Sequence, residues 1–255
     1  MDTLKGLPKL LAAIGAGLWL TLRAASGMAR RTLAGDALAQ RQMAQALPVH
    51  VWRPLRTLLP LAALAGAIAG TGAARLLALY NAQIPVLTAL AAILLRDIAP
   101  LLVGLFACGS VSVALAARLG AMALNREIDA LEALGRDPVA HALGPSLAAV
   151  LLSIPIHISL AAVAAVIGCG VPLGLIANVA WPLWAGYALS HDAAQALLTG
   201  MGKLLLYALI AFAVGSAVGA KPVRSPADIG RRAITAFTAG LLGIFAAAAI
   251  WTGLA

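Results

Sequence analysis

The sequence predicts an all-α polytopic membrane protein with about five transmembrane helices, an N-terminal interfacial helix and a short helix on a cytoplasmic loop. Hydrophobic residues make up 62% of the 255 residues and charged residues only 11%, a balance typical of a chain that lies largely in lipid. Alternating apolar segments of about ten residues, which a membrane β-barrel needs, do not occur. The apolar residues instead form five long runs: Leu58–Leu79, Val86–Ala117, Ala142–Ile167, Ala193–Ala220 and Ala233–Leu254.

The basic residues indicate how the chain is oriented. Of the 18 Lys and Arg residues, eight lie in residues 1–57, three in residues 118–137 and four in residues 221–232. These segments fall on one side of a chain with five spans, and Lys and Arg accumulate in short cytoplasmic loops. We therefore expect a cytoplasmic N-terminus and an external C-terminus at Ala255. Because the basic residues are interleaved with the spans, the net charge of +9 does not indicate a nucleic-acid partner.

The region before the first span, residues 1–57, is expected to differ from the transmembrane domain at residues 58–255. Residues 10–22 are uncharged but too short to span a bilayer. Basic residues before them and small residues after them also occur in signal peptides, although three arginines follow closely and oppose translocation. We expect an interfacial helix along the inner leaflet, with a signal peptide as the alternative. A soluble linker is expected to follow at Ala34–Pro48.

Two other segments between the apolar runs have a distinct composition. Residues 168–192 are rich in Gly, Pro and Trp and are expected to form an outer loop. The stretch between the second and third runs is charged. Within it, Asn125 is a favourable N-cap, Gly135 can take the left-handed conformation that ends a helix, and Pro138 prevents continuation. The sequence therefore predicts a helix at 125–135, about 15 Å long and half of what a bilayer requires.

One face of this short helix is apolar. Ile128, Leu131 and Leu134 recur every three residues, with Glu127 and Asp129 on the flanks of the stripe. A compact amphipathic helix on an aqueous loop has a shape that a partner protein can bind. The residues expected to contact that partner are Glu127, Ile128, Asp129, Leu131, Glu132 and Leu134.

Catalytic and metal-binding patterns are weak. The four histidines have no partner at ligand spacing, which argues against a zinc site. Cys108 and Cys169 lie in apolar segments, where buried thiols are expected. His157, within the third run, fits a helix-packing residue better than a proton relay, and both interpretations stay open. No Ser or Thr follows Gly202-Lys203, so this is no phosphate-binding loop. We expect a protein that is not an enzyme and has no cofactor of its own.

The stretch from Leu95 to Pro155 resembles the MlaE/YrbE-type permease subunits of ABC transporters that work with MCE proteins. The likeness is carried by four stretches: Leu95–Leu102 (LRDIAPLL), Ala116–Met122 (AARLGAM), Glu127–Pro138 (EIDALEALGRDP) and Ser153–Pro155 (SIP). Outside these stretches the likeness is mostly one of topology, and it includes Lys203 in the fourth span.

This resemblance implies a homodimeric permease of the bacterial inner membrane that moves phospholipids or related lipids between the inner and outer membranes. Cytoplasmic ABC ATPases, which bind ATP and Mg, would dock on the helix at 125–135 as a coupling helix. A periplasmic MCE protein would lie above the dimer. A secondary transporter, or a non-transporting scaffold for an MCE-type complex, is the alternative.

Three positions depart from the family pattern. Ser110 and Ser112 stand where the family usually has Arg and Gly in the string Gly-Arg-Val-Gly, and Arg118 stands where it has an acid. These departures weaken what the resemblance implies about the lipid species and the direction of transport, and they leave the implied fold and role intact.

Arg75, Arg96 and Lys203 are the basic residues outside the cytoplasmic segments. Helical rise puts them about 26, 32 and 26 Å from the cytoplasmic ends of their spans, near the outer boundary of a hydrocarbon core of about 30 Å. Cations at one depth, with Asp97 beside Arg96, could hold an anionic lipid head group. The resemblance favours Arg96 and Lys203 over Arg75 for this role. The alternative is that each side chain reaches the outer interface independently.

Overall fold

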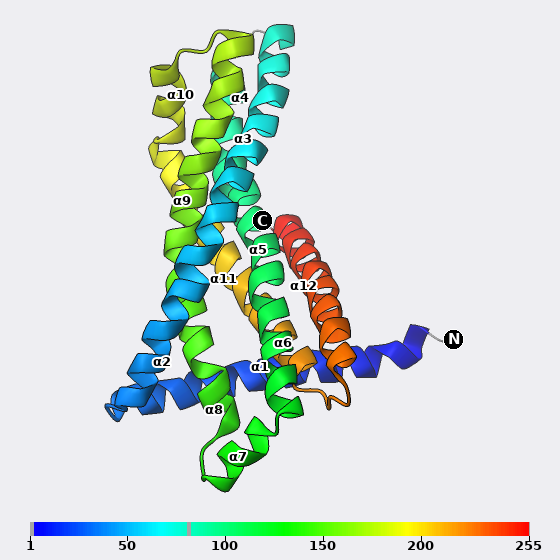
Figure 1. The fold of residues 1–255 in the computed structure, drawn as a ribbon. Coiled ribbons are helices and arrows are strands. Elements are labelled where there is room, and N and C mark those ends of the chain that lie inside the picture. Colours follow the sequence, from blue (N-terminus) through cyan, green and yellow to red (C-terminus); the bar gives the residue numbers. More distant parts are fainter. Residues whose placement is uncertain (1–2, 81–82, 255) are drawn as a thin grey trace. The chain divides into compact units, whose positions relative to one another are not determined.

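The computed structural model describes residues 3–80 and 83–254, and every regular element in these residues is helical (Figure 1). Five helical runs are long and apolar enough to cross a membrane, namely Ala37–Leu79, Gln83–Leu124, Pro138–Ala177, His191–Gly219 and Pro226–Gly253. The predicted all-α membrane architecture with five spans is thus confirmed. Ala255, the predicted external terminus, lies outside the described residues.

The second run contains two π-helical turns, and a third such turn leads from α2 into α3. The elements in chain order are α1 (Thr3–Leu33), α2 (Ala37–Leu47), η1 (Pro48–Trp52), α3 (Arg53–Tyr80), α4 (Gln83–Ile93), η2 (Leu94–Ile98), α5 (Ala99–Ala107), η3 (Cys108–Ser112), α6 (Val113–Leu124), α7 (Glu127–Ala133), α8 (Pro138–Ala142), α9 (Gly144–Ala177), α10 (Trp181–Ala188), α11 (His191–Gly219) and α12 (Pro226–Leu254).

The chain divides into two compact units, each assembled from separate stretches of sequence. Unit 1 comprises Met1–Val51, Leu105–Ser153 and Leu206–Ala255, and it contains α6, α7, α8 and α12 together with the N-terminal helices. Unit 2 comprises Trp52–Gly104 and Ile154–Leu205, and it contains α3, α4 and α10. The helices α9 and α11 contribute one part to each unit.

Unit 1 is held together by close contacts between helix backbones. Gly215 and Gly219 of α11 lie against Ser112 of η3 and Ala116 of α6, where the missing side chains allow the helices to approach. The Ser112 hydroxyl donates a hydrogen bond of 2.6 Å to the carbonyl oxygen of Ala211 in α11. In Figure 1, α1 runs crosswise to α6 and α12 of the same unit. The spacing Gly215-x-x-x-Gly219 therefore marks a helix contact within this unit.

Unit 2 shows the same kind of packing. Gly66 and Gly70 of α3 lie against the backbone of Ala165 and Cys169 in α9. Trp184 of α10 is fully buried, and its ring N–H donates a hydrogen bond of 3.0 Å to a backbone carbonyl of α9. Buried Leu and Ala side chains from α3, α4 and α9 fill the space around this tryptophan. Close helix approach and a single large aromatic side chain thus build the apolar core of this unit.

The segment at 168–192 is mostly helical, so the prediction of an outer loop there is wrong. α9 continues to Ala177, and Trp181–Ala188 form α10. Gly170 lies against the ring of Trp181, so this glycine provides room for packing and does not end the helix. An apolar environment also tolerates the proline inside this part of α9, because neighbouring elements can satisfy the freed backbone groups.

The N-terminal region is also more helical than predicted. The interfacial helix expected at 10–22 is part of α1, which extends over 31 residues. Most of the linker expected at Ala34–Pro48 is α2. This helix begins where the Asp36 carboxylate accepts a hydrogen bond of 2.9 Å from the backbone N–H of Leu38, a side-chain cap typical of helix starts.

Candidate functional site

The short helix α7 begins at a tight turn. Its N-cap is Arg126, which has the left-handed conformation at φ 57°, whereas Asn125 caps the end of α6. The backbone N–H of Asn125 donates a hydrogen bond of 2.9 Å to the carbonyl of Ala121, so Asn125 completes the preceding helix. The prediction of Asn125 as the N-cap is therefore wrong, and α7 begins at Glu127.

The C-terminal end of α7 confirms the prediction that Gly135 ends this helix in the left-handed conformation. Gly135 has φ 67°, and its N–H donates a hydrogen bond of 2.9 Å to the carbonyl of Glu132. The N–H of Arg136 donates a second hydrogen bond of 2.9 Å to the carbonyl of Leu131. This pair of bonds is a Schellman motif, which satisfies the last carbonyls of a helix. Pro138 then starts α8, as its fixed φ favours at a first helical position.

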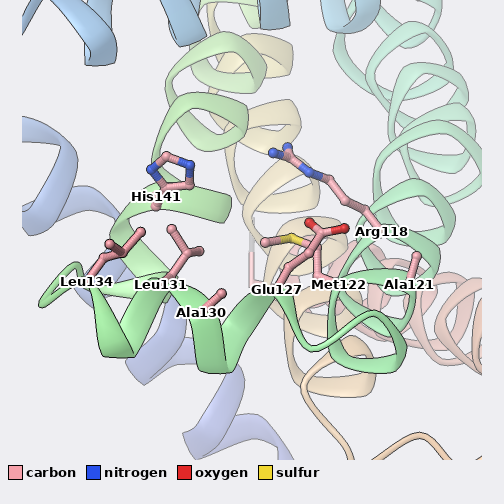
Figure 2. A pocket seen from close by; sticks show the side chains of 8 residues that line it. All are labelled: Arg118, Ala121, Met122, Glu127, Ala130, Leu131, Leu134 and His141. Atoms are coloured by element: carbon pink, nitrogen blue, oxygen red, sulfur yellow. The ribbon is translucent and has the colours of Figure 1, made fainter.

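A pocket of about 460 Å³ opens beside α7 (Figure 2). Its apolar lining comes from Leu131, Leu134 and Ala130 of the α7 region and from Ala121 and Met122 of α6. Of the three apolar residues predicted to form one face of the helix, Leu131 and Leu134 line the pocket and Ile128 does not. The complete lining is Arg118, Ala121, Met122, Glu127, Ala130, Leu131, Leu134 and His141.

The rim of this pocket is charged and polar. Figure 2 shows Arg118 and Glu127 directed toward the pocket from α6 and α7, with His141 of α8 on the opposite side. Arg118 also donates a hydrogen bond of 3.3 Å to the hydroxyl of the buried Ser146. Leu134 is 74% exposed, so the apolar lining is open to a partner. The pocket thus combines an apolar floor with groups of both charges at its edge.

The three carboxylates of α7 are exposed to solvent, and that of Glu127 also lines the pocket. Glu127, Asp129 and Glu132 are all exposed, and the helix fully buries no residue. Acids in the first turn also suit the positive end of the helix dipole. The outer face of α7 consequently presents negative charge to whatever approaches it.

Side chains from the N-terminal helices hold α8 in place. Asp137, the N-cap of α8, accepts a hydrogen bond of 3.1 Å from Nε of Arg23 in α1. His141 contacts the side-chain amide of Gln42 in α2 at 3.1 Å, and Gln42 accepts a hydrogen bond of 3.3 Å from Arg31. The loop that leaves α7 is therefore anchored to both N-terminal helices of unit 1.

Sequence reasoning missed this anchoring network. Gln42 and His141 are 99 residues apart, and neither belongs to a local motif that would indicate a contact. Arg31 is also tied locally, because its Nε donates a hydrogen bond of 2.9 Å to Asp36. That hydrogen bond lowers the pKa of the Asp36 carboxyl below its usual value.

Unit 2 contains an ion pair within its helices. The Lys203 ammonium of α11 donates a hydrogen bond to the Asp97 carboxylate of η2, and the two groups form a salt bridge. The Lys203 side chain is only 3% exposed, whereas the Asp97 side chain is 41% exposed. Because a buried ammonium is costly unless it is paired, the Asp97 carboxylate offsets part of the cost of burying Lys203.

The backbone around this pair is shaped to bring it together. Asp97 lies in the π-helical turn η2, which rotates the side chains that follow relative to a regular helix. Gly200, one turn before Lys203, lies against the carbonyl of Leu95, so α11 approaches η2 closely. Pro100 follows on the same side and cannot donate a backbone hydrogen bond. The wide turn and the glycine together explain why the pair forms here.

Arg96 and Arg75, the other two basic residues predicted near the outer boundary, are less buried than Lys203. Arg96 is half-buried and Arg75 is exposed. Among residues 3–80 and 83–254, neither side chain makes a hydrogen bond or ion pair with another residue. The structure therefore brings Asp97 together with Lys203 and leaves the guanidinium of Arg96 available next to that pair.

The structure shows what Ser110 and Ser112, two residues that depart from the family pattern, do in this chain. Both lie in η3, and the Ser110 hydroxyl donates a hydrogen bond of 3.0 Å to the carbonyl of Phe106 one turn earlier. Ser112 is fully buried and bonds across to α11. Both hydroxyls therefore satisfy backbone carbonyls around a π-helical turn.

The proteins and the family to which this chain is similar are all described as permeases. A probable ABC transporter permease protein of Rickettsia bellii is 28% identical over 89 residues, which is 35% of this chain and 34% of that relative. A second protein of the same description from Rickettsia felis is 27% identical over 89 residues, with the same coverage. The alignments thus span about a third of the length of these relatives. The family model described as "Permease MlaE" matches residues 43–254. Because this match covers most of the chain, this multi-pass helical membrane protein belongs to the MlaE permease family.

Proposed function

We propose that the chain is the permease subunit of an ABC transporter that moves phospholipids or related lipids between the inner and outer membranes of a bacterium. The observation that carries the proposal is α7, a short helix that follows a tight turn, ends in a Schellman motif and is flanked by a pocket, in a chain of the MlaE permease family. The relatives described as ABC transporter permeases support the same assignment. ATP and Mg would be bound by a separate cytoplasmic ATPase, because this chain lacks a phosphate-binding loop.

The ATPase would dock on α7 and on the pocket beside it. The exposed acids Glu127, Asp129 and Glu132 favour basic groups on the partner, and the pocket can receive an apolar side chain between them. Leu131 and Leu134 then contribute as pocket walls, while Ile128 lies outside the pocket lining. Fixed ends make α7 suitable for transmitting force, because the helix would move as a rigid body with α6 and α8.

The lipid head group would bind near the Asp97–Lys203 pair. Arg96 is the group best suited to the phosphate, since its planar guanidinium offers two parallel donors and has no partner among the described residues. Lys203 is already paired with Asp97, so its charge is largely balanced and it contributes less as a direct donor. Arg75, which is exposed, is expected to have the smaller effect.

The remaining partners follow from the family. A second copy of this chain, a periplasmic MCE protein and membrane lipid complete the proposed complex, and nucleic acid is not a partner. An ion-coupled secondary transporter is less favoured, because Asp97 is the one acid in the apolar runs of the sequence and it is paired with a lysine. A non-transporting scaffold would not need the pocket beside α7.

Reporter fusions test the orientation on which this assignment depends. Fusions after Gly135 and after Lys221 should report a cytoplasmic location, because these segments carry most of the basic residues that follow the N-terminal region. Fusions after Trp181 and Ala255 should report a periplasmic location. A cytoplasmic signal after Ala255 would contradict the arrangement of five spans.

A further inference from the structure

Arg118 places a positive charge in the wall of the pocket beside α7. It lies three and four residues before Ala121 and Met122 on α6, so the three side chains share one face of that helix and line the pocket together. Arg118 is exposed, and Figure 2 shows its side chain directed toward the pocket. A group that enters the pocket can therefore reach this guanidinium.

One end of the Arg118 guanidinium is already held. Its Nη1 donates the hydrogen bond of 3.3 Å to the hydroxyl of Ser146, which is 2% exposed near the start of α9. Among residues 3–80 and 83–254, no carboxylate forms an ion pair with Arg118. The edge formed by Nε and Nη2 presents two parallel N–H donors, which is the geometry that binds both oxygens of a carboxylate.

The acids around this pocket are bound to other groups. Asp137 pairs with Arg23 at 3.1 Å. Glu127, the acid in the described pocket lining, accepts a hydrogen bond of 3.3 Å from the side-chain amide of Asn125. The α6 wall of the pocket thus carries a positive charge with no carboxylate bound to it, and the α7 wall carries a negative one.

We infer that Arg118 binds a carboxylate of the ATPase and that this contact helps to select the ATPase that the permease accepts. The inference rests on the proposed function, which places an ATPase segment in this pocket, and it adds the chemistry of that segment. An Asp or Glu would face α6, next to the apolar side chain that contacts Leu131 and Leu134, and basic groups would face the acids of α7. Opposite charges on two sides of one segment fix its orientation and disfavour a partner with the reversed pattern.

The apolar lining of the pocket strengthens this charge pair. A segment seated against Met122, Ala130 and Leu131 would displace water, and opposite charges attract more strongly where water is excluded. A partner without the carboxylate would cover the guanidinium and leave it unpaired, which costs affinity. The volume of about 460 Å³ is typical of pockets that hold small organic ligands, so an apolar and an acidic side chain can enter together.

Titration of the ATPase against the detergent-solubilised permease tests the inference. Arg118→Glu should weaken binding by more than about tenfold, because it sets a carboxylate against the carboxylate of the partner. Arg118→Lys keeps the charge but loses the paired donors, and should weaken binding about threefold. Arg136→Glu makes the same charge change at an exposed position outside the pocket lining and should keep most of the affinity. Equal losses with Arg118→Glu and Arg136→Glu would overturn the inference.

Charge exchange identifies the acid on the partner. Each surface Asp and Glu of the ATPase would be changed to Lys and titrated against the wild-type permease, Arg118→Glu and Arg118→Gln. One such variant should bind Arg118→Glu at least about fivefold more tightly than the wild-type ATPase does, and its loss against Arg118→Gln should be smaller than its loss against the wild-type permease. The comparison with Arg118→Gln does not depend on the folding of Arg118→Glu. Additive losses for every ATPase variant would refute a carboxylate bound to Arg118.

Leu131→Asp in the same titration separates this inference from the proposed function. Loss of the ATPase with Leu131→Asp but not with Arg118→Glu would show that the ATPase docks at the pocket without binding Arg118, which overturns the inference alone. Retention of the ATPase by both variants would overturn the docking site as well.

Discussion

Leu131→Asp should release the ABC ATPase from the permease. Leu131 lines the pocket beside α7, and the side chain that enters this pocket is expected to bury its apolar surface there. Burial of an apolar side chain contributes about 1.5–3 kcal/mol, and a carboxylate in the wall would lose this and add a desolvation cost. We expect more than a tenfold loss of affinity (over about 1.4 kcal/mol), measured by co-purification and by titration of the detergent-solubilised permease.

The matched control is Ala133→Asp, which adds the same charge to the same helix at an exposed position outside the pocket lining. This variant should retain most of the ATPase. Helicity and monodispersity should be the same for both variants, because α7 fully buries no residue. ATPase retention by Leu131→Asp equal to that by Ala133→Asp would show that the pocket is not the docking site.

The second large effect is expected at the ion pair of unit 2. Asp97→Asn removes the carboxylate partner of the Lys203 ammonium, whose side chain is 3% exposed, and should reduce stability by about 2 kcal/mol. Fully buried pairs lose about 3–5 kcal/mol, and the value here is lower because Asp97 is 41% exposed. Lys203→Met removes the buried charge and keeps most of the side-chain volume, so it should destabilise less. Thermal unfolding in detergent measures the difference.

Replacing the two unpaired arginines separates a structural role from lipid binding. Arg96→Ala should reduce co-purifying phospholipid with little loss of stability, because Arg96 has no partner among the described residues. Arg75→Ala should reduce it less. Equal destabilisation by Asp97→Asn and Lys203→Met would contradict the account of the buried charge, and unchanged lipid in Arg96→Ala would favour a cation that merely reaches the membrane boundary.

The sequence predicted the features that depend on local chemistry. Five apolar runs were sufficient to predict five spans, because a bilayer admits few alternatives for an uncharged run of that length. Gly135 was correctly predicted to end α7, since a residue at positive φ after an apolar stripe has a clear local signature.

The sequence did not predict features that depend on distant contacts. A loop is predicted at residues 168–192 because glycine and proline usually interrupt helices, but α9 continues to Ala177 and Gly168 lies against the backbone of α3. Asn125 is a good N-cap by type, yet its N–H is used to complete α6. Asp97 was expected beside Arg96, and its pairing with Lys203 depends on the π-helical turn, which no local pattern announces.

Transfer of labelled phospholipid tests the central claim most directly. The permease, its ATPase and an MCE protein would be reconstituted in vesicles, and the lipid that moves between these vesicles and acceptor vesicles would be followed with ATP or with a non-hydrolysable analogue. We predict transfer that requires hydrolysable ATP and that falls to background with Leu131→Asp. Transfer of equal rate with the analogue, or with Leu131→Asp, would contradict an ABC permease coupled through α7.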